Sequence, residues 1–247
     1  TTSSPGTTGR APAADQPGTV ITDWTASAPT AGEWLAVNFG HLREVGALVL
    51  DWAPGAHATV YDVLLSADGQ KWTTAASATR GNGGRDYLYL PEQQGRWLKL
   101  VVRATATGQA VSLARLEVKG PEAGMNENAF FQIVARDQPR GTYPKYLLPE
   151  QAYWTVIGSP ADLTEALVSE TGAIEIDQGS FTIEPFLLVD GKLVTWGDVT
   201  LRQSLEKNYL PIPSVEWQTG GLTLTTTAFA AGAAGPESRL LATYRIA

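Results

Sequence analysis

Apolar and polar side chains alternate along residues 61–66, which predicts a β-strand with one apolar face. Asp68 and Gly69 follow, and this pair is typical of tight turns that need positive backbone angles. The chain returns through residues 71–73. We therefore expect a β-hairpin with Trp72 anchoring one end.

The same period of two recurs along the chain. In the first half it predicts strands at residues 96–102 and 111–118. In the second half it predicts strands at residues 129–135, 153–157, 173–176, 181–189, 192–199, 222–229 and 239–246. Asp190-Gly191 lies between two of these strands and predicts a second hairpin turn.

One segment favours a short helix instead. Residues 160–169 carry Pro160 at the first helical position, and Ser159 and Asp162 make a capping-box pattern. Strands still far outnumber helices in the predicted pattern. This favours a mainly β fold built from sandwiches.

The chain has 247 residues, which suggests two structural units. Residues 1–18 are rich in Thr, Ser, Pro, Gly and Ala and predict a disordered linker or tail. Gly and Pro at residues 120–124 interrupt the strand pattern and predict a boundary between units at 19–120 and 125–247. Because the sequence stops inside a predicted strand, we expect the second unit to be truncated.

Composition narrows the class of partner. The net charge is -7, and the 18 Lys and Arg residues are scattered, which argues against a nucleic acid or an anionic membrane as partner. No apolar run is long enough to cross a bilayer. The chain has no Cys, so disulfides and thiolate metal sites are excluded.

Several segments occur in an order that resembles the discoidin family, also called the coagulation factor five/eight type C domain. They are EWLAVNFG at 33–40, VLDW at 49–52, YDVLLSADGQKWT at 61–73, GRWLKLVV at 95–102 and SLARLEVKG at 112–120. The resemblance implies a jelly-roll β-sandwich. Bacterial members are carbohydrate-binding modules of secreted glycosidases, while other discoidin domains bind lipids or proteins.

The second half resembles the N-terminal β-sandwich that precedes a six-hairpin α-toroid catalytic domain in large bacterial glycosidases. The segments that carry this resemblance are ENAFFQIV at 127–134, YPKYLLPEQAYW at 143–154, EPFLLVDGKLVTWGDV at 184–199, QSLEKNYLPIPSVEW at 203–217 and LTLTTTAFAAG at 222–232. The expected fold is thus a discoidin-like β-sandwich followed by a second antiparallel β-sandwich. The resemblance implies a non-catalytic, extracellular accessory region whose partners are a glycan and a downstream catalytic domain.

A sugar site needs an aromatic face for the pyranose and rigid polar groups for its hydroxyls. In the discoidin-like unit the candidate ligand-binding residues are Trp24, His57, Arg80, Asn82, Arg85 and Tyr87. Trp52, Trp72 and Trp97 lie in or beside predicted strands, and we expect them in the core. The family resemblance also implies a structural calcium ion, for which Asp15, Thr19 and Glu117 are the nearest matches.

Glycosidases need two carboxyl groups across one bond, but no spacing singles out a pair here. The candidates are Glu175, Asp177, Glu184, Asp198, Glu206 and Glu216. On strands with period two most of these side chains would be solvated, so we assign no catalytic residue.

Two alternatives stay open. In one, the chain belongs to a glycoside hydrolase whose active site is completed by the missing toroid, with Trp196, Asp198 or Trp217 lining the substrate cleft. In the other, the first unit is a structural or protein-binding discoidin module without a sugar ligand.

Overall fold

The computed structural model describes residues 2–3, 8–10, 20–29, 31–106, 108–177, 179–233, 235 and 237–247. The chain divides into two compact units, Thr1–Val134 and Ala135–Ala247. This boundary falls inside helix α1 (Glu127–Arg136), whereas the sequence places the break at residues 120–124.

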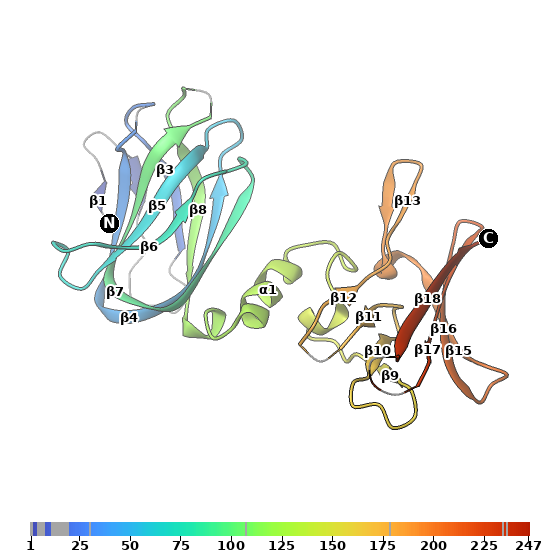
Figure 1. Cartoon of the computed structure of the whole chain (residues 1–247). Coiled ribbons are helices and arrows are strands. Elements are labelled where there is room, and N and C mark those ends of the chain that lie inside the picture. The colour runs from blue at the N-terminus through green and yellow to red at the C-terminus, as the bar shows by residue number, and fades with distance from the viewer. Residues whose placement is uncertain are drawn as a thin grey trace. The chain divides into compact units, whose positions relative to one another are not determined.

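Antiparallel strands dominate the first unit (Figure 1). They are β1 (Thr2–Ser3), β2 (Thr8–Arg10), β3 (Val20–Thr25), β4 (Trp34–Trp52), β5 (Ala58–Ser66), β6 (Thr73–Ala78), β7 (Arg85–Thr105) and β8 (Ser112–Lys119), followed by the 3-10 turn η1 (Pro121–Ala123). They pair in the order β2-β3-β8-β4-β7-β5-β6, with β1 on β4. Two short pieces of the segment expected to be a linker therefore form strands of this sheet.

The long strands β4 and β7 run through both layers of the sandwich. The first part of β4 pairs with the last part of β7, with Ala36 opposite Lys99. The last part of β4 pairs with the first part of β7, with Leu50 opposite Asp86. Because both strands bend between these stretches, one hydrogen-bonded sheet folds over its own core. The result is the discoidin-like β-sandwich expected from the sequence.

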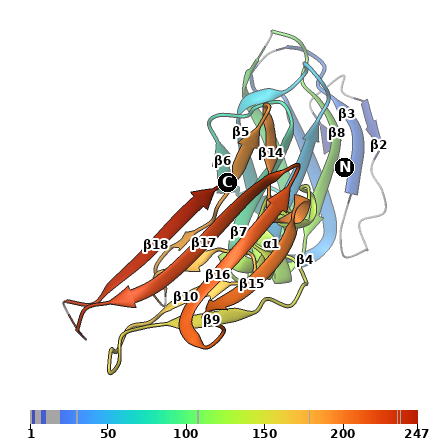
Figure 2. The same cartoon turned by 90° about the vertical axis from the view of Figure 1, so that its right-hand side faces the viewer.

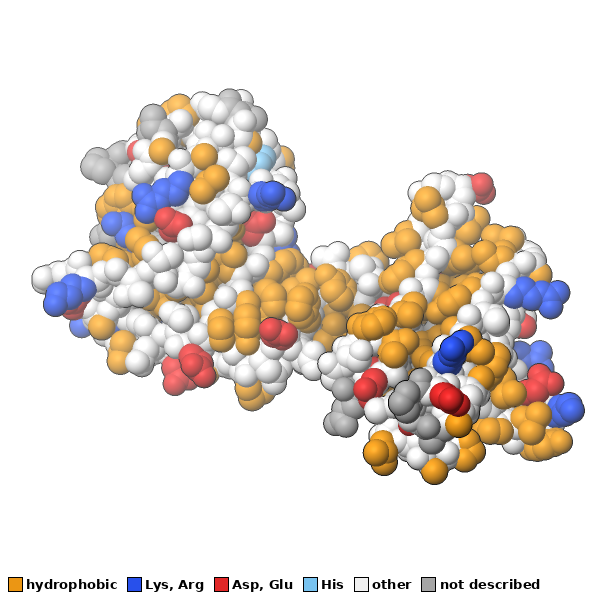
Figure 3. All heavy atoms as spheres, in the orientation of Figure 1, with side chains coloured by type: hydrophobic (Ala, Val, Ile, Leu, Met, Phe, Trp, Pro, Cys, Tyr) orange, Lys and Arg blue, Asp and Glu red, His pale blue; other side chains and the backbone are white. Residues whose placement is uncertain are grey.

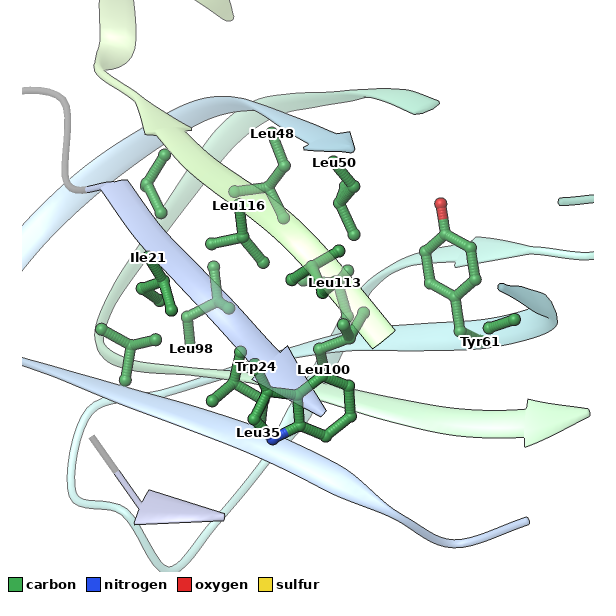
Figure 4. Packing of buried hydrophobic residues seen from close by; sticks show 14 of the residues in the cluster. Ile21, Trp24, Leu35, Leu48, Leu50, Tyr61, Leu98, Leu100, Leu113 and Leu116 are labelled. Carbon is green, nitrogen blue, oxygen red and sulfur yellow. The ribbon is translucent and has the colours of Figure 1, made fainter. Parts of the chain in front are cut away.

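Side chains that alternate along these strands fill the space between the layers (Figure 4). The largest fully buried side chains of this core are Trp24, Tyr61, Phe39, Ile21, Leu35, Leu48, Leu50, Leu90, Leu98, Leu100 and Leu113. Burial of this apolar set is the main force that holds the first unit together.

The hairpin expected at β5 and β6 is confirmed, with Leu65 opposite Thr73. Its turn differs from the expected one, because only Gly69 has a positive φ, of 78°. The Asp68 carboxylate instead accepts hydrogen bonds from the backbone N–H groups of Gln70 and Lys71, both at 2.8 Å. The side chain of Asp68 therefore organises a longer loop.

Of three tryptophans expected in the core, Trp52 is buried but Trp72 and Trp97 are only half-buried. They border the outer face of the sheet, where Lys99 projects. Its Nζ lies 4.3 Å from the ring centroid of Trp34 and 5.3 Å from that of Trp72. The expectation was wrong for these two residues because a strand pattern does not tell which face the partner layer covers.

Residues 129–135 form most of α1 and not the strand that their apolar character suggested. The Asn126 side chain caps this helix, since its Oδ1 accepts a hydrogen bond from the backbone N–H of Ala129 at 2.8 Å. The ring of Phe130 packs 5.3 Å from that of Tyr89, centroid to centroid. This aromatic contact ties the start of the helix to β7.

The second unit is again built mainly of antiparallel strands. They are β9 (Trp154–Ile157), β10 (Ala166–Ser169), β11 (Ile174–Glu175), β12 (Thr182–Ile183), β13 (Leu187–Val189), β14 (Lys192–Val194), β15 (Thr200–Glu206), β16 (Leu210–Thr219), β17 (Leu222–Ala231) and β18 (Arg239–Ile246). The 3-10 turn η2 (Lys145–Leu147) precedes β9, and η3 (Trp196–Asp198) lies between β14 and β15.

Two four-stranded sheets, β12-β11-β10-β9 and β15-β16-β17-β18, share the core of the second unit (Figure 2). The first sheet contributes Ile157, Ala166, Val168 and Ile174, and the second contributes Val215, Trp217, Leu224 and Ala228. The unit is therefore an antiparallel sandwich, as expected from the sequence.

The short β13–β14 hairpin has the expected turn, because both Asp190 and Gly191 have positive φ, of 49° and 77°. The helix expected at residues 160–169 is absent, and its last four residues form β10. Ala161 has a φ of 65°, which a right-handed helix does not allow. Ser159 donates its hydroxyl hydrogen bond to the carbonyl of Gly232, so it does not cap a helix.

Candidate functional site

An open pocket of about 410 Å³ lies in the first unit, where the start of β7 meets the preceding loop and α1. Its polar lining residues are Tyr61, Thr79, Arg80, Arg85, Asp86 and Tyr87. Phe130 and Phe131 of α1 add apolar aromatic surface to the lining. The pocket thus combines charged groups of both signs with aromatic surface.

Asp86 is held in this pocket by two hydrogen bonds. Its Oδ2 accepts hydrogen bonds from Trp52 Nε1 and from the Tyr61 hydroxyl, both at 2.8 Å. Burial, with the hydrogen bond and the charge of Asp86, raises the pKa of Tyr61, so this hydroxyl stays protonated and keeps donating. A carboxylate fixed in this way is a preorganised acceptor for a ligand hydroxyl.

Arg80 and Arg85 line the same pocket as Asp86. Arg85 donates to both carboxylate oxygens of Asp51, with Nε at 2.5 Å and Nη2 at 3.1 Å, which fixes its guanidinium in the plane of a bidentate pair. Arg80 is exposed and makes no ion pair with any residue that the structure describes. Arg80 is therefore the donor that is free to adapt to a ligand.

Phe131 gives the pocket its exposed aromatic face, since 42% of the residue is accessible to solvent. Its ring packs edge-on against that of Phe130, with centroids 5.5 Å apart. Sequence reasoning missed Phe131 because residues 129–135 were assigned to a strand of the second unit. The N-cap residue Asn126 was the signal that could have revealed a helix here.

His57 and Asn82, also expected in the site, lie in adjoining loops and do not line this pocket. Asn82 Oδ1 accepts a hydrogen bond from the backbone N–H of Gly84 at 2.9 Å, which shapes the loop before β7. Gly83 packs against His57 so closely that a Cβ on it would lie 2.5 Å from His57 Nδ1. The structure therefore brings together Arg80, Arg85 and Tyr87 and leaves His57 and Asn82 beside them.

Trp24 was expected to offer a sugar-stacking face, and that expectation is wrong. The residue is 0% exposed and packs in the core of the first unit (Figure 4). On β3 it lies opposite Leu113 of β8, so its ring points between the layers. A buried indole has no face that a sugar can reach.

Two of the three expected cleft residues of the second unit are buried as well. Trp196 is 4% exposed and Trp217 is 1% exposed, and each donates its Nε1–H to a backbone carbonyl, of Tyr143 and Thr171 respectively. Asp198 remains exposed, but its carboxylate accepts hydrogen bonds from the backbone and hydroxyl of Thr195 in a capping box. These bonds lower the pKa of Asp198.

Two of the three expected calcium ligands, Asp15 and Thr19, lie outside the described residues. The third, Glu117, accepts hydrogen bonds from Arg115 at 2.8 Å and from Lys119 at 2.5 Å. In the described part of the chain no three His, Asp or Glu side chains gather as metal ligands would. Calcium binding therefore stays a prediction.

Comparison with known proteins supports the fold of the first unit. The family model described as F5/8 type C domain matches residues 1–117. This match covers the discoidin-like sandwich and supports the resemblance of its sequence to the discoidin family. No curated protein sequence matches the chain significantly. None of the described helices is long and apolar enough to span a membrane.

Two solved structures are among those similar to the chain. Chitosan-binding module 1 of a chitosanase/glucanase from Paenibacillus sp. IK-5 is 27% identical, with 40% of this chain and 76% of that chain covered and a TM-score of 0.38. Module 2 of the same enzyme, in complex with chitotriose, is 29% identical, with 40% and 77% covered and a TM-score of 0.37. TM-scores this low establish neither the fold nor the ligand of this protein.

Proposed function

We propose that the first unit binds carbohydrate in the pocket formed by the start of β7 and α1. The observation that carries this proposal is the position of exposed Phe131 beside the fixed acceptor Asp86 and the adaptable donor Arg80. An aromatic face covers the apolar side of a pyranose, and oriented charged groups hydrogen-bond its hydroxyls. The F5/8 type C match supports a binding module over residues 1–117.

We further propose that the chain is an accessory region of a secreted bacterial glycoside hydrolase. The support is the resemblance of the second unit to the sandwich that precedes an α-toroid catalytic domain. In such a protein the first unit would hold the enzyme on its glycan and raise its local concentration there.

Affinity electrophoresis of the full chain against a polysaccharide panel tests the binding proposal. The panel contains chitosan, the polymer named for the two Paenibacillus modules, together with neutral glucans and galactans. We expect retardation by at least one polymer. Phe131→Ala and Arg80→Ala should each weaken it about tenfold, since each removes one ligand contact.

Arg202→Ala is the matched control, because Arg202 is an exposed arginine on β15 of the second unit. It should bind as the unmodified chain does. Equal affinities of the Phe131 variant and this control would show that the pocket is not the sugar site. Absence of any glycan binding would favour a structural or protein-binding role for the first unit.

A further inference from the structure

A pocket of about 310 Å³ lies between the two four-stranded sheets of the second unit. It is lined by β9 and β10 of one sheet and by β15 and β16 of the other (Figure 2). Val168 and Val215 line this pocket and also belong to the core of the unit. The pocket is therefore an opening at the margin of the core and not a hollow on the outer face of either sheet.

Strand pairing places two polar side chains on the walls of this pocket. Thr155 on β9 lies opposite Val168 on β10, and Gln203 on β15 lies opposite Val215 on β16. Residues directly opposite each other in a sheet project to the same side, so Thr155 and Gln203 point toward the space between the sheets. Both are nevertheless exposed, because the apolar core does not extend this far.

Tyr153 and Leu205 add apolar surface to the same pocket. The backbone N–H of Glu170 donates to the carbonyl of Tyr153 at 3.0 Å, which continues the pairing of β9 with β10 and places Tyr153 on the side of Thr155. Leu205 pairs with Pro213, which also lines the pocket. Tyr153 is 60% exposed, so its ring is accessible to a ligand. Hydrophobic side chains are spread over the face of the second unit seen in Figure 3, and the pocket differs from them in combining apolar with polar groups.

The pocket presents no unpaired charge. Among the described residues that line it, Glu170 is the only charged one, and it is 8% exposed. One carboxylate oxygen lies 2.8 Å from Lys145 Nζ, and the other accepts the backbone N–H of Tyr153 at 2.8 Å. The backbone carbonyl of Glu170 accepts a hydrogen bond from Gln203 Nε2 at 3.3 Å, which connects the two walls.

Three neutral polar groups of the pocket are not used by the fold. Within the part of the chain that the structure describes, the hydroxyls of Tyr153 and Thr155 make no hydrogen bond, and Gln203 bonds only through its Nε2. A hydroxyl can donate and accept, and the Oε1 of Gln203 can accept. The pocket therefore offers both donors and acceptors to a neutral ligand.

We infer that this pocket binds one uncharged sugar ring. The apolar side of the ring packs on Tyr153 and Leu205, and its hydroxyls bond to Thr155 and Gln203. At about 310 Å³ the pocket is near the lower end of the usual range for ligand sites, which suits a single ring.

Two other classes of occupant fit less well. A purely apolar side chain of a partner protein would bury the hydroxyls of Tyr153 and Thr155 without hydrogen bonds, which costs free energy. A charged ligand would lose its hydration without gaining an opposite charge, because both oxygens of Glu170 are engaged. The site belongs to the second unit and does not depend on the pocket of the first unit.

Proton–nitrogen NMR of the full chain tests this inference through the side-chain amide of Gln203. That signal is assigned as the one that the Gln203→Glu variant lacks. The probes are the methyl β-pyranosides of glucose, galactose, mannose and N-acetylglucosamine, added one at a time. At least one of them should shift the Gln203 signal saturably, with a Kd on the order of 1 mM.

Two variants test the two kinds of contact. Tyr153→Ala removes the exposed ring and should weaken binding about tenfold, while the backbone bond to Glu170 stays. Thr155→Val keeps the shape of the side chain, removes its hydroxyl and should weaken binding about fivefold. Tyr209→Ala is the matched control, because Tyr209 is an exposed tyrosine between β15 and β16 that does not line the pocket. It should bind as the unmodified chain does.

No shift of the Gln203 signal by any of the four glycosides up to about 50 mM would overturn the inference. Equal affinities of the Tyr153 variant and the Tyr209 control would do the same. N-acetyl-leucinamide is the apolar comparison, and tighter binding of this compound than of every glycoside would assign the pocket to a side chain of a protein partner. Because Gln203 itself lines the pocket, its signal separates this outcome from that of the first unit, which the Phe131 and Arg80 variants test.

Discussion

The hydroxyl of Tyr61 donates a hydrogen bond to Asp86 Oδ2 at 2.8 Å, from the core of the first unit to the lining of its pocket. Tyr61→Phe keeps the ring and removes this bond. We expect a loss of about 1.5–3 kcal/mol of unfolding free energy, the usual net value of a hydrogen bond to a charged group, and weaker glycan binding. Urea unfolding and affinity electrophoresis measure the two effects. Tyr244→Phe, at an exposed tyrosine, should alter neither.

Trp24→Ala should destabilise the first unit by about 3–5 kcal/mol, because it leaves a cavity where a fully buried indole packs. Trp72→Ala should cost only about 1 kcal/mol, since Trp72 is half-buried and its charged contact with Lys99 is a weak cation–π interaction. Urea unfolding followed by tryptophan fluorescence compares the two variants. Similar losses would contradict the burial difference between these residues.

Gly83→Ala should destabilise the first unit more than Gly55→Ala. Both glycines have positive φ, 82° and 75°, so both substitutions carry the same backbone strain. Only at Gly83 would the new Cβ also meet a side chain, that of His57. Thermal unfolding of the two variants isolates this contact, and equal melting temperatures would show that His57 moves aside without cost.

The stability of the second unit should fall as pH rises from about 4.5 to about 7. The folded state raises the pKa of Glu184 from 4.5 to about 7, so between these values it binds more protons than the unfolded state. The stabilisation is complete below pH 4.5 and is lost through pH 7. After allowance for partial exposure we expect about 1–2 kcal/mol.

Urea unfolding at pH 4.5 and pH 7 measures this change. Glu184→Gln should remove the part of the pH dependence that Glu184 causes, whereas Glu206→Gln should keep it. An unchanged pH profile in the Glu184 variant would mean that this carboxyl titrates alike in both states.

Local patterns in the sequence predicted those elements that depend on neighbouring residues. The strand pairing of the β5–β6 hairpin formed as expected, although its turn did not, and the Asp190-Gly191 turn formed as expected. The strands at β17 and β18 did so as well, because alternation and turn chemistry act over a few residues. The strand prediction for residues 129–135 was wrong because a short apolar run fits a strand or a helix equally. Here the Asn126 cap and the contact of Phe130 with Tyr89 favour the helix.

The sequence by itself determined the mainly β class, the discoidin resemblance and three residues of the candidate pocket, Arg80, Arg85 and Tyr87. Only the tertiary structure decided that Trp24, Trp196 and Trp217 are buried and that Phe131 joins the pocket from a helix more than 40 residues away along the chain. The physical reason is that strand period fixes which side chains share a face. Which face is then covered depends on the packing of segments far apart in sequence.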